Sequence, residues 1–375
     1  MIKLLHAVYG GTGGAARIVV DIAKNHDRTR FEPAVLLVGY EVDPNYLTEL
    51  QSCGVQGYFL LKRGQWDWGF LRALRQTILE NRPDAVFFHT PVAYFWGRLA
   101  VLGLGIKCVV SVEHLATAAH YGLRGRLVNL IQSHLVSDRV ICVSRDVKEM
   151  VKKALWLPDV KIDVIENGLP VDRCPRADLE ALFTEQPVRI KMVSRLDGQK
   201  DPATLIKAVK LLKERGFTIG LDFVGDGVLR KDMESLTTEL NLSDSISFLG
   251  TRTDIPELLQ DTDIFVLSTH AEGLSIALLE AMAAGLPCVA TAVPGNFDVI
   301  EDRVSGLLAT ENDPVSLCAC MTYLIENPES ARRMAAAARE RVSAKYDIAC
   351  TVRKYEKVCD EILAGRLKHH KPGLT

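Results

Sequence analysis

The chain has no excess of charge of either sign, no long apolar run and no repeat or low-complexity segment. Its 375 residues include 45 Lys and Arg against 47 Asp and Glu, so no overall field would attract nucleic acid. No apolar run reaches the roughly 18 residues that a membrane-spanning helix needs. Residues 1–8 lack the basic flank and cleavage pattern of a signal peptide. We therefore expect neither nucleic-acid binding nor a spanning segment.

Cysteines are present but form no pattern. The nine occur at positions 53, 108, 142, 174, 288, 318, 320, 350 and 359, without a C-x-x-C pair. An odd number of scattered thiols argues against a disulfide framework or a structural metal, and favours a reducing cytoplasm. The length is ample for two cores, and 48% hydrophobic residues with 25% charged residues are typical of a globular protein.

Strand-like apolar runs alternate with helix-like runs in two series. The first series predicts strands at 3–8, 31–38, 57–61, 84–88, 107–112, 139–143 and 161–165. The second predicts strands at 189–193, 220–224, 245–248, 263–267, 288–290 and 306–309. Helical runs lie between most of them, which is typical of a parallel sheet covered on both faces. A polar, Pro-containing stretch at 171–187 separates the series, so we expect two α/β domains.

An acidic pair brackets a predicted strand-to-helix turn in the second series. Glu272 stands in a Gly turn after the run 264–267, and Glu280 stands on the helical run that ends at Gly285. The helix N-terminus between them offers backbone N–H groups and a positive dipole end to an anion. A ligand with hydroxyls at both ends and phosphate in the middle, such as a nucleotide-sugar, suits this layout. The alternative is a capped surface helix with two ordinary acids.

Two cations follow the first strand of the same series. Arg195 and Lys200 lie between that strand and a predicted helix with Asp201 as N-cap, at the edge where open α/β sheets bind ligands. Together they would neutralise a diphosphate, although solvated loop charges remain an alternative. Gly225 and Gly250 end two further strands, where glycine permits close approach of a ligand.

These motifs resemble those of retaining glycosyltransferases of family 4. Ser-Arg-Leu-x-x-x-Lys-Asp at 194–201, Val-Gly-Asp-Gly at 224–227, Phe-Leu-Gly at 248–250 and the Glu-x7-Glu pair at 272–280 occur in that family's order. The first half adds the Gly-rich loop 10–14 and Glu-Asn-Gly at 166–168, so the resemblance covers essentially the whole chain.

The resemblance implies the GT-B fold, in which two Rossmann-like domains with parallel sheets face each other across a central cleft. It implies an acceptor-side domain at 1–170, a linker at 171–187 and a nucleotide-sugar-binding domain at 188–345. It also implies that residues 346–375 begin with a helix that crosses back to the first domain.

The Gly-rich loop near the N-terminus has two interpretations. It follows the first strand but lacks the spacing of a dinucleotide fingerprint. Such a fingerprint is followed about 20 residues later by an acidic residue at the end of the second strand. Glu32 has about the right separation but stands at the start of that strand, so an oxidoreductase is disfavoured. By resemblance, Gly13 and Gly14 contact the transferred sugar or the acceptor. Arg17, one turn into the helix, is a candidate phosphate ligand or a solvated helix residue.

His114 follows the strand 107–112 and by resemblance hydrogen-bonds the donor sugar. Leu115 replaces the Asp that often accompanies this His in the family, and Glu113 precedes it. A structural histidine is the alternative for His114. His89 is a weaker candidate, and His6, inside the first strand, is predicted to belong to the core.

The predicted chemistry is transfer of a hexosyl-type sugar from a nucleotide diphosphate, with retained anomeric configuration and no metal. His114, Arg195, Lys200 and Glu272 form the predicted catalytic set. Lys200, Arg195 and the N–H groups of Gly273, Leu274 and Ser275 would bind the diphosphate. Glu272 would bind hydroxyls of the sugar, and Glu280 would accept both ribose hydroxyls. The donor is expected to be a UDP-sugar, with a GDP-sugar as the second choice.

The acceptor is predicted only by class, as a glycan, a lipid-linked sugar or an envelope polysaccharide. Residues 62–70 mix basic and aromatic side chains, and residues 121–135 form a basic, partly apolar helix. Both stretches suit peripheral contact with an anionic membrane, at the inner face of the cytoplasmic membrane, although core packing explains them as well. Two other functions remain open: a non-catalytic nucleotide-sugar-binding subunit, and an epimerase or phosphorylase on the same scaffold.

Overall fold

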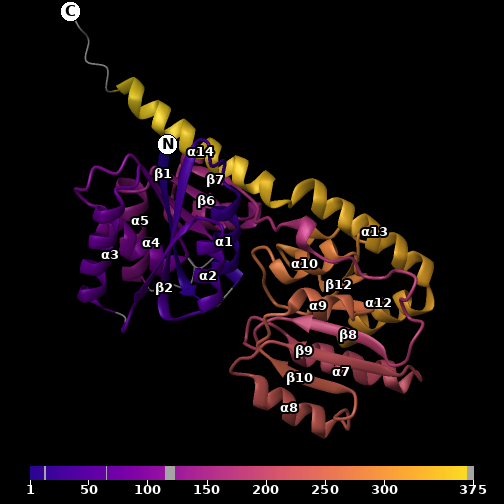
Figure 1. The fold of residues 1–375 in the computed structure, drawn as a ribbon. Coiled ribbons are helices and arrows are strands. Elements are labelled where there is room, and N and C mark those ends of the chain that lie inside the picture. Colours follow the sequence, from indigo (N-terminus) through magenta and orange to yellow (C-terminus); the bar gives the residue numbers. More distant parts are fainter. Residues whose placement is uncertain (12–13, 65, 115–122, 370–375) are drawn as a thin grey trace, which may run out of the picture. The chain divides into compact units, whose positions relative to one another are not determined.

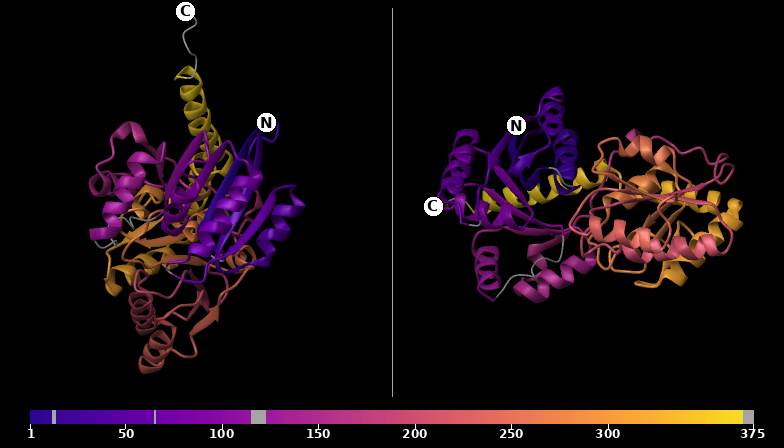
Figure 2. Two further views of the ribbon diagram at one scale, coloured as in Figure 1. Left: turned by 90° about the vertical axis from the view of Figure 1, so that its left-hand side faces the viewer. Right: turned by 90° about the horizontal axis from the view of Figure 1, so that it is seen from below.

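The computed structural model describes residues 1–11, 14–64, 66–114 and 123–369, and divides into two units. Unit 1 contains Met1–Gly168 and Ile348–Thr375, and unit 2 contains Leu169–Asp347. Each unit has one parallel sheet with helices on both faces (Figure 1; Figure 2). The predicted class, two Rossmann-like α/β domains, is confirmed.

Unit 1 is built on a seven-stranded sheet in the order β3-β2-β1-β4-β5-β6-β7. Its strands are β1 Ile2–Gly11, β2 Phe31–Val42, β3 Gln56–Leu61, β4 Ala85–His89, β5 Cys108–Glu113, β6 Arg139–Cys142 and β7 Ile162–Val164. Its helices are α1 Gly14–Asn25, α2 Pro44–Ser52, α3 Trp68–Asn81, α4 Pro91–Ala100, α5 Leu123–Leu135, α6 Arg145–Leu155 and α14 Ile348–His369. One hydrophobic cluster joins the sheet to α3 and α4, and another joins it to α1 and α2.

Unit 2 is built on a six-stranded sheet in the order β10-β9-β8-β11-β12-β13. Its strands are β8 Val188–Val193, β9 Ile219–Val224, β10 Ile246–Gly250, β11 Ile264–Leu267, β12 Cys288–Thr291 and β13 Leu307–Ala309. Its helices are α7 Pro202–Glu214, α8 Arg230–Glu239, α9 Ile255–Gln260, α10 Ile276–Ala284, α11 Asn296–Val299, α12 Pro314–Glu326 and α13 Pro328–Lys345. The main core lies between the sheet and α7, α8 and α12.

The strand order reverses once in each sheet, and these points locate the candidate ligand sites. In unit 1 the reversal lies between β1 and β4, and in unit 2 it lies between β8 and β11. Open α/β sheets bind ligands outside the carboxyl ends of strands at such a point, because the loops diverge there.

The predicted strands are all present, and the predicted N-cap at Asp201 is confirmed, since its side chain accepts from the Thr204 N–H. Residues 171–187, expected to be a linker, lie in unit 2, where Arg332 donates to the Leu179 carbonyl at 2.8 Å. The terminal helix α14 lies in unit 1 and packs on α1. Among the described helices, none combines the length and apolar character needed to span a membrane.

Candidate functional site

The loops after β8 and β11 are joined by hydrogen bonds at the reversal point of unit 2. The His270 N–H donates to the Gln199 carbonyl at 2.9 Å, and the Asp201 N–H donates to the Ser268 carbonyl at 3.1 Å. Lys200 and Thr269 form a further backbone bridge. This pairing fixes the two predicted motifs against each other, although they lie about 70 residues apart in the chain.

Lys200 and Glu272 form an ion pair between these loops. The Lys200 Nζ contacts the Glu272 Oε1, and the two side chains are only 11% and 7% exposed. Arg195 differs, since its side chain is 69% exposed and its Nη1 lies 2.9 Å from the Asp197 Oδ2. The structure therefore brings two of the predicted residues into direct contact and places Arg195 at the surface of the same loop.

The segment after Glu272 leads directly into α10. Ser275 is the N-cap, and its hydroxyl accepts from the Leu278 N–H at 3.4 Å. Gly273 and Leu274 are buried in the turn, and Glu280 lies on the helix that follows. The partial positive charge of the helix N-terminus thus lies beside the Lys200–Glu272 pair.

Gly295 supports this turn and was not predicted from the sequence. Its φ is +87°, and a Cβ there would lie 2.7 Å from the Glu272 carbonyl oxygen and 2.8 Å from that of Gly273. The turn that carries Glu272 therefore requires glycine at 295. The only sequence signal was the Pro-Gly pair at 294–295, which predicts a turn but not the contact.

Gly225 and Gly250 lie at the ends of β9 and β10, and the Gly225 N–H donates to the Gly250 carbonyl at 2.8 Å. Gly225 has φ +134°, and a Cβ there would lie 2.0 Å from the Ser194 carbonyl oxygen. The space beside Gly225 is thus filled by the chain itself, so packing of the β8 loop is sufficient to explain this glycine. Gly250 has φ +69°, and a Cβ there would lie 3.4 Å from the Arg230 Nη1.

In unit 1, Arg17 is bound to two carboxylates. Its Nε lies 2.8 Å from the Asp21 Oδ2 and its Nη1 lies 2.7 Å from the Glu49 Oε2. Burial alone would lower the pKa of Arg17, but the hydrogen bonds with Glu49 and Asp21 raise it above its usual value. These ion pairs account for Arg17 without a phosphate. Gly14 is exposed at the first residue of α1, whereas Gly13 falls outside the described residues.

His114 lies at the carboxyl end of β5, beside His89 at the end of β4. The His114 Nε2 and the His89 Nδ1 are 3.3 Å apart. Burial lowers the pKa of His114 to about 4, so the ring is neutral at pH 7. The adjacent Leu115 lies outside the described residues. Within the described part of the chain, no group of three or more His, Cys, Asp or Glu side chains is placed to hold a metal ion.

A cavity of about 380 Å³ opens near the carboxyl ends of β1 and β2 in unit 1. Its lining is largely aromatic and consists of Tyr9, Tyr40, Lys62, Trp66, Pro91, Val92, Tyr94, Phe95, Trp96, Gly125 and Asn129. The Lys62 Nζ lies 5.6 Å from the centre of the Trp96 ring, and Trp66 is 66% exposed. Part of the basic, aromatic segment 62–70 thus lines this cavity. The role of α4 in it was missed, although Tyr-Phe-Trp at 94–96 was a visible signal.

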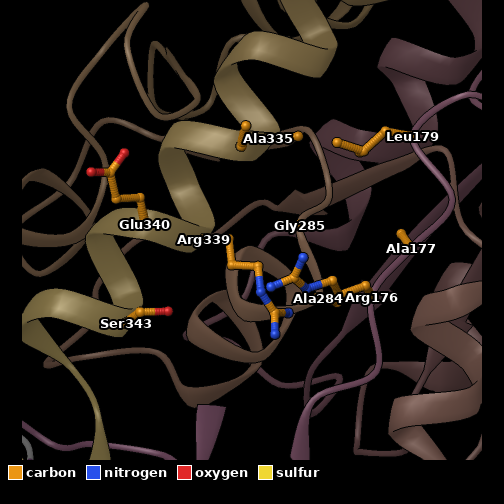
Figure 3. Close-up of a pocket in the computed structure, with 10 residues that line it drawn as sticks. Arg176, Ala177, Leu179, Ala284, Gly285, Ala335, Arg339, Glu340 and Ser343 are labelled. Carbon is orange, nitrogen blue, oxygen red and sulfur yellow. The ribbon is translucent and has the colours of Figure 1, made fainter. Parts of the chain in front are cut away.

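A second cavity, of about 330 Å³, lies at the opposite end of α10 (Figure 3). Arg176 and Arg339 lie together in it, and Arg339 donates to the Ala283 carbonyl in the last turn of the helix. Gly285 is the C-cap, so this cavity is about 14 Å along the helix from Ser275. Burial lowers the pKa of Arg339, and the neighbouring Arg176 adds to this effect. Arg339 thus stabilises the end of α10 that points away from the Lys200–Glu272 pair.

Two family models match consecutive parts of the chain. Glycosyltransferase Family 4 matches residues 12–173, and Glycosyl transferases group 1 matches residues 179–341. The UDP-Gal:alpha-D-GlcNAc-diphosphoundecaprenol alpha-1,3-galactosyltransferase of Escherichia coli is 31% identical over 263 residues, which cover 66% of this chain and 67% of that protein. The lipopolysaccharide core biosynthesis glycosyltransferase LpsD of Rhizobium meliloti is 28% identical, over 97% of this chain and 100% of its own length.

Solved structures agree with this result at the level of the fold. Anabaena Alr3699/HepE in complex with UDP and glucose superimposes with a TM-score of 0.82 at 21% identity, over 96% of this chain and 100% of that chain. Sucrose-phosphate synthase from Thermosynechococcus elongatus superimposes with a TM-score of 0.81 at 17% identity, over 97% and 100%. Together with the family models, these likenesses show that the chain belongs to the glycosyltransferases of the GT-B fold, with a family 4 segment followed by a group 1 segment.

Proposed function

We propose that the chain is a retaining glycosyltransferase that moves a hexosyl group from a nucleotide-diphosphate sugar to a hydroxyl of a glycan, lipid-linked or envelope-polysaccharide acceptor. The observation that carries the proposal is the Lys200–Glu272 pair at the strand reversal of unit 2, beside the N-terminus of α10. A UDP-sugar is the favoured donor and a GDP-sugar is the second choice. The relative from Escherichia coli is named for a UDP-galactose donor and a diphosphoundecaprenol-linked acceptor.

When the donor binds, Lys200 would exchange its partner Glu272 for the diphosphate. A diphosphate placed at the start of α10 offers Lys200 and Arg195 stronger acceptors than single carboxylates, because it carries more charge. When Lys200 turns to the phosphate, Glu272 is released to accept hydrogen bonds from the sugar hydroxyls. Glu280, on α10, is then the proposed acceptor for the ribose hydroxyls.

The proposed reaction proceeds on one face of the sugar. The bond between the anomeric carbon and the phosphate oxygen breaks, and the acceptor oxygen bonds to the anomeric carbon from the same side. The acceptor proton passes to the departing phosphate oxygen. Lys200, Arg195 and the N–H groups of residues 273–275 stabilise the negative charge that develops on the diphosphate.

The acceptor is proposed to use the aromatic cavity of unit 1. Flat aromatic rings such as Trp66 and Trp96 bury the apolar face of a sugar or an isoprenoid, and Lys62 supplies a charge for an acceptor phosphate. On α5, apolar side chains are exposed at Leu127, Ile131 and Leu135. Together these features support peripheral contact with an anionic membrane. Co-sedimentation with anionic vesicles at low salt, weakened at high salt, is the expected result, and no binding at low salt would rule out the contact.

The donor is identified by incubating the protein with a panel of UDP- and GDP-sugars and measuring released nucleotide with and without glycan or lipid-linked acceptors. A transferase releases UDP or GDP in an acceptor-dependent way. An epimerase would instead convert the donor without release, and a binding subunit would show only a raised melting temperature. The anomeric configuration of the product, read by proton NMR, tests retention, and inversion would exclude the proposed mechanism.

A further inference from the structure

Five side chains form one continuous hydrogen-bonded chain through the interior of unit 1. The Glu356 Oε1 lies 3.0 Å from the His26 Nδ1, and the His26 Nε2 lies 3.0 Å from the His6 Nε2. The His6 Nδ1 lies 3.1 Å from the His89 Nε2, and the His89 Nδ1 lies 3.3 Å from the His114 Nε2. We call this set the histidine chain. It runs from α14 to the candidate catalytic residue at the end of β5.

Packing fixes the rings of the histidine chain in place. The His6 ring stacks on Phe87 with an interplanar angle of 12° and a centroid distance of 4.9 Å. The His89 ring stacks on Tyr355 with an angle of 13°. His6, His26 and His89 are at most 3% exposed. Each ring therefore keeps both of its nitrogen contacts, and rotation of one ring would break two hydrogen bonds.

The rings of His6 and His89 are neutral. Burial lowers the pKa of His6 and of His89 well below the usual value for histidine, and the neighbouring rings add to this effect. A neutral imidazole has one N–H and one unprotonated nitrogen. In a chain of neutral rings, every link therefore needs one donor and one acceptor, and the whole chain has a single direction.

Glu356 sets that direction. Burial would raise its pKa, but the hydrogen bonds from His26 and from the Asp27 N–H outweigh burial and lower the pKa. Glu356 is therefore a carboxylate, which only accepts hydrogen bonds. The same Oε1 also accepts from the Asp27 N–H at 2.9 Å, so the oxygen is held toward the first ring.

The tautomer of each ring in the histidine chain can be assigned by starting from Glu356. If His26 carries a single proton, as its neighbours do, it donates from Nδ1 to Glu356, and its Nε2 accepts from the Nε2–H of His6. His6 then accepts at Nδ1 from the Nε2–H of His89, and His89 accepts at Nδ1 from the Nε2–H of His114. The Nδ1 of His114 is left with a lone pair.

We propose that Glu356, His26, His6 and His89 are positioning residues that hold His114 in the Nε2–H tautomer, so that its Nδ1 accepts a hydrogen bond from a sugar hydroxyl. Only the identity of the ligand rests on the function proposed above. An unprotonated nitrogen attracts a hydroxyl hydrogen and repels a phosphate oxygen. The histidine chain therefore makes this end of unit 1 selective for a neutral, hydroxyl-bearing group.

The tautomers are read by long-range proton–nitrogen correlation NMR on protein labelled with nitrogen-15 in histidine. In the wild type, His114 is expected with a protonated Nε2 and a bare Nδ1. Glu356→Gln keeps an acceptor oxygen and should leave this tautomer unchanged. Glu356→Leu removes the acceptor, and His6→Phe interrupts the chain while keeping an aromatic ring beside Phe87. Both should give His114 a mixture of tautomers.

His134→Phe is the control, because His134 contacts the Leu155 carbonyl and lies outside the histidine chain. The proposal is overturned if wild-type His114 carries its proton on Nδ1, or if it is an imidazolium at neutral pH. It is also overturned if His6→Phe leaves the tautomer unchanged.

Binding experiments separate positioning from a general structural role. Glu356→Leu and His6→Phe should weaken the binding of the donor nucleotide-sugar roughly tenfold, the value of one hydrogen bond, and leave the affinity for UDP or GDP alone unchanged. Glu356→Gln should restore donor binding. Equal losses for donor and nucleotide would overturn the proposal. If the wild type binds no nucleotide-sugar, the proposed function fails, whereas the NMR result still decides the tautomer.

Discussion

Lys200 and Arg195 carry equal charge but lie in different surroundings, and this difference shapes their expected contributions. Lys200 is nearly buried and held by Glu272, whereas Arg195 projects into solvent beside Asp197. A charge that is shielded from water stabilises a transition state more than a solvated one, because less solvent screens it. Lys200 is therefore expected to contribute more to the rate.

We predict that Lys200→Ala and Arg195→Ala each lower kcat/KM by two or more orders of magnitude, the range for a lost transition-state donor, with the larger loss for Lys200. Steady-state release of UDP or GDP measures the effect. Arg252→Ala is the control, since Arg252 is an exposed arginine of unit 2 that pairs with Asp254. Near-normal turnover in both site variants would remove the diphosphate assignment.

Gly225 has two possible explanations, which can be tested against each other: close packing of the β8 loop, and close approach of a ligand to the backbone. We predict that Gly225→Ala destabilises unit 2 by a few kcal/mol, because the new Cβ overlaps the Ser194 carbonyl oxygen and the residue keeps a positive φ. Gly198→Ala is the control, since no atom lies within 4 Å of a Cβ there. Urea unfolding measures both. A variant of normal stability that fails only in donor binding would favour ligand approach instead.

The sequence predicted the candidate site best for residues that directly follow a predicted strand. Lys200 and Glu272 both follow strands, so their location at one edge of a sheet could be predicted. Their direct contact could not, because it depends on the order in which β8 and β11 pair. The histidine chain was missed for the same reason. His6 was predicted only as a core residue. Its partner His89, and Glu356 that binds its other partner His26, come from distant parts of the chain.

At the scale of elements, periodicity predicted the strands because buried parallel strands are short, continuous apolar runs between turn residues. Helix α4 was not predicted individually. Arg98 is its single charged residue, so no polar face distinguished it from a buried strand. Because α4 was not predicted, its contribution to the aromatic cavity was not predicted either.

Helices α1 and α2 are joined by ion pairs whose strength should depend on pH. Glu49 binds Arg17 and Lys24, and these contacts lower the pKa of Glu49 to about 2, mainly through the hydrogen bond with Arg17. The pKa of an unfolded Glu is about 4.3. The group therefore stabilises the folded state above pH 4.3, and this contribution is lost as the pH falls toward 2.

We predict that Glu49→Gln lowers the free energy of unfolding by about 1–2 kcal/mol at pH 7 and by progressively less between pH 4 and pH 2.5. Chemical denaturation across this range measures the difference between variant and wild type. Glu80→Gln is the control, because Glu80 accepts from the neutral Gln76 amide and has no ion-pair partner among the residues that the structure describes. A difference that stays constant with pH would contradict the assignment.

At the scale of the whole molecule, the two units differ in how the chain builds them. Unit 2 is one continuous segment with its own core between the sheet and α7, α8 and α12. Unit 1 is completed only when α14, the last helix, packs on α1 and brings Glu356 to His26. The terminal helix is thus part of the first core, and it also sets the polarity of the histidine chain.

This difference predicts unequal behaviour of the two parts in isolation. A fragment of residues 169–347 should unfold cooperatively, since all of its core contacts lie within one segment, and UDP or GDP should raise its melting temperature. A fragment of residues 1–168 should be markedly less stable and should regain stability when residues 348–375 are joined to it through a flexible linker. Circular dichroism melts of the three fragments measure this. If 1–168 alone were as stable as the joined form, α14 would be dispensable for the first core, and its role would be limited to placing Glu356.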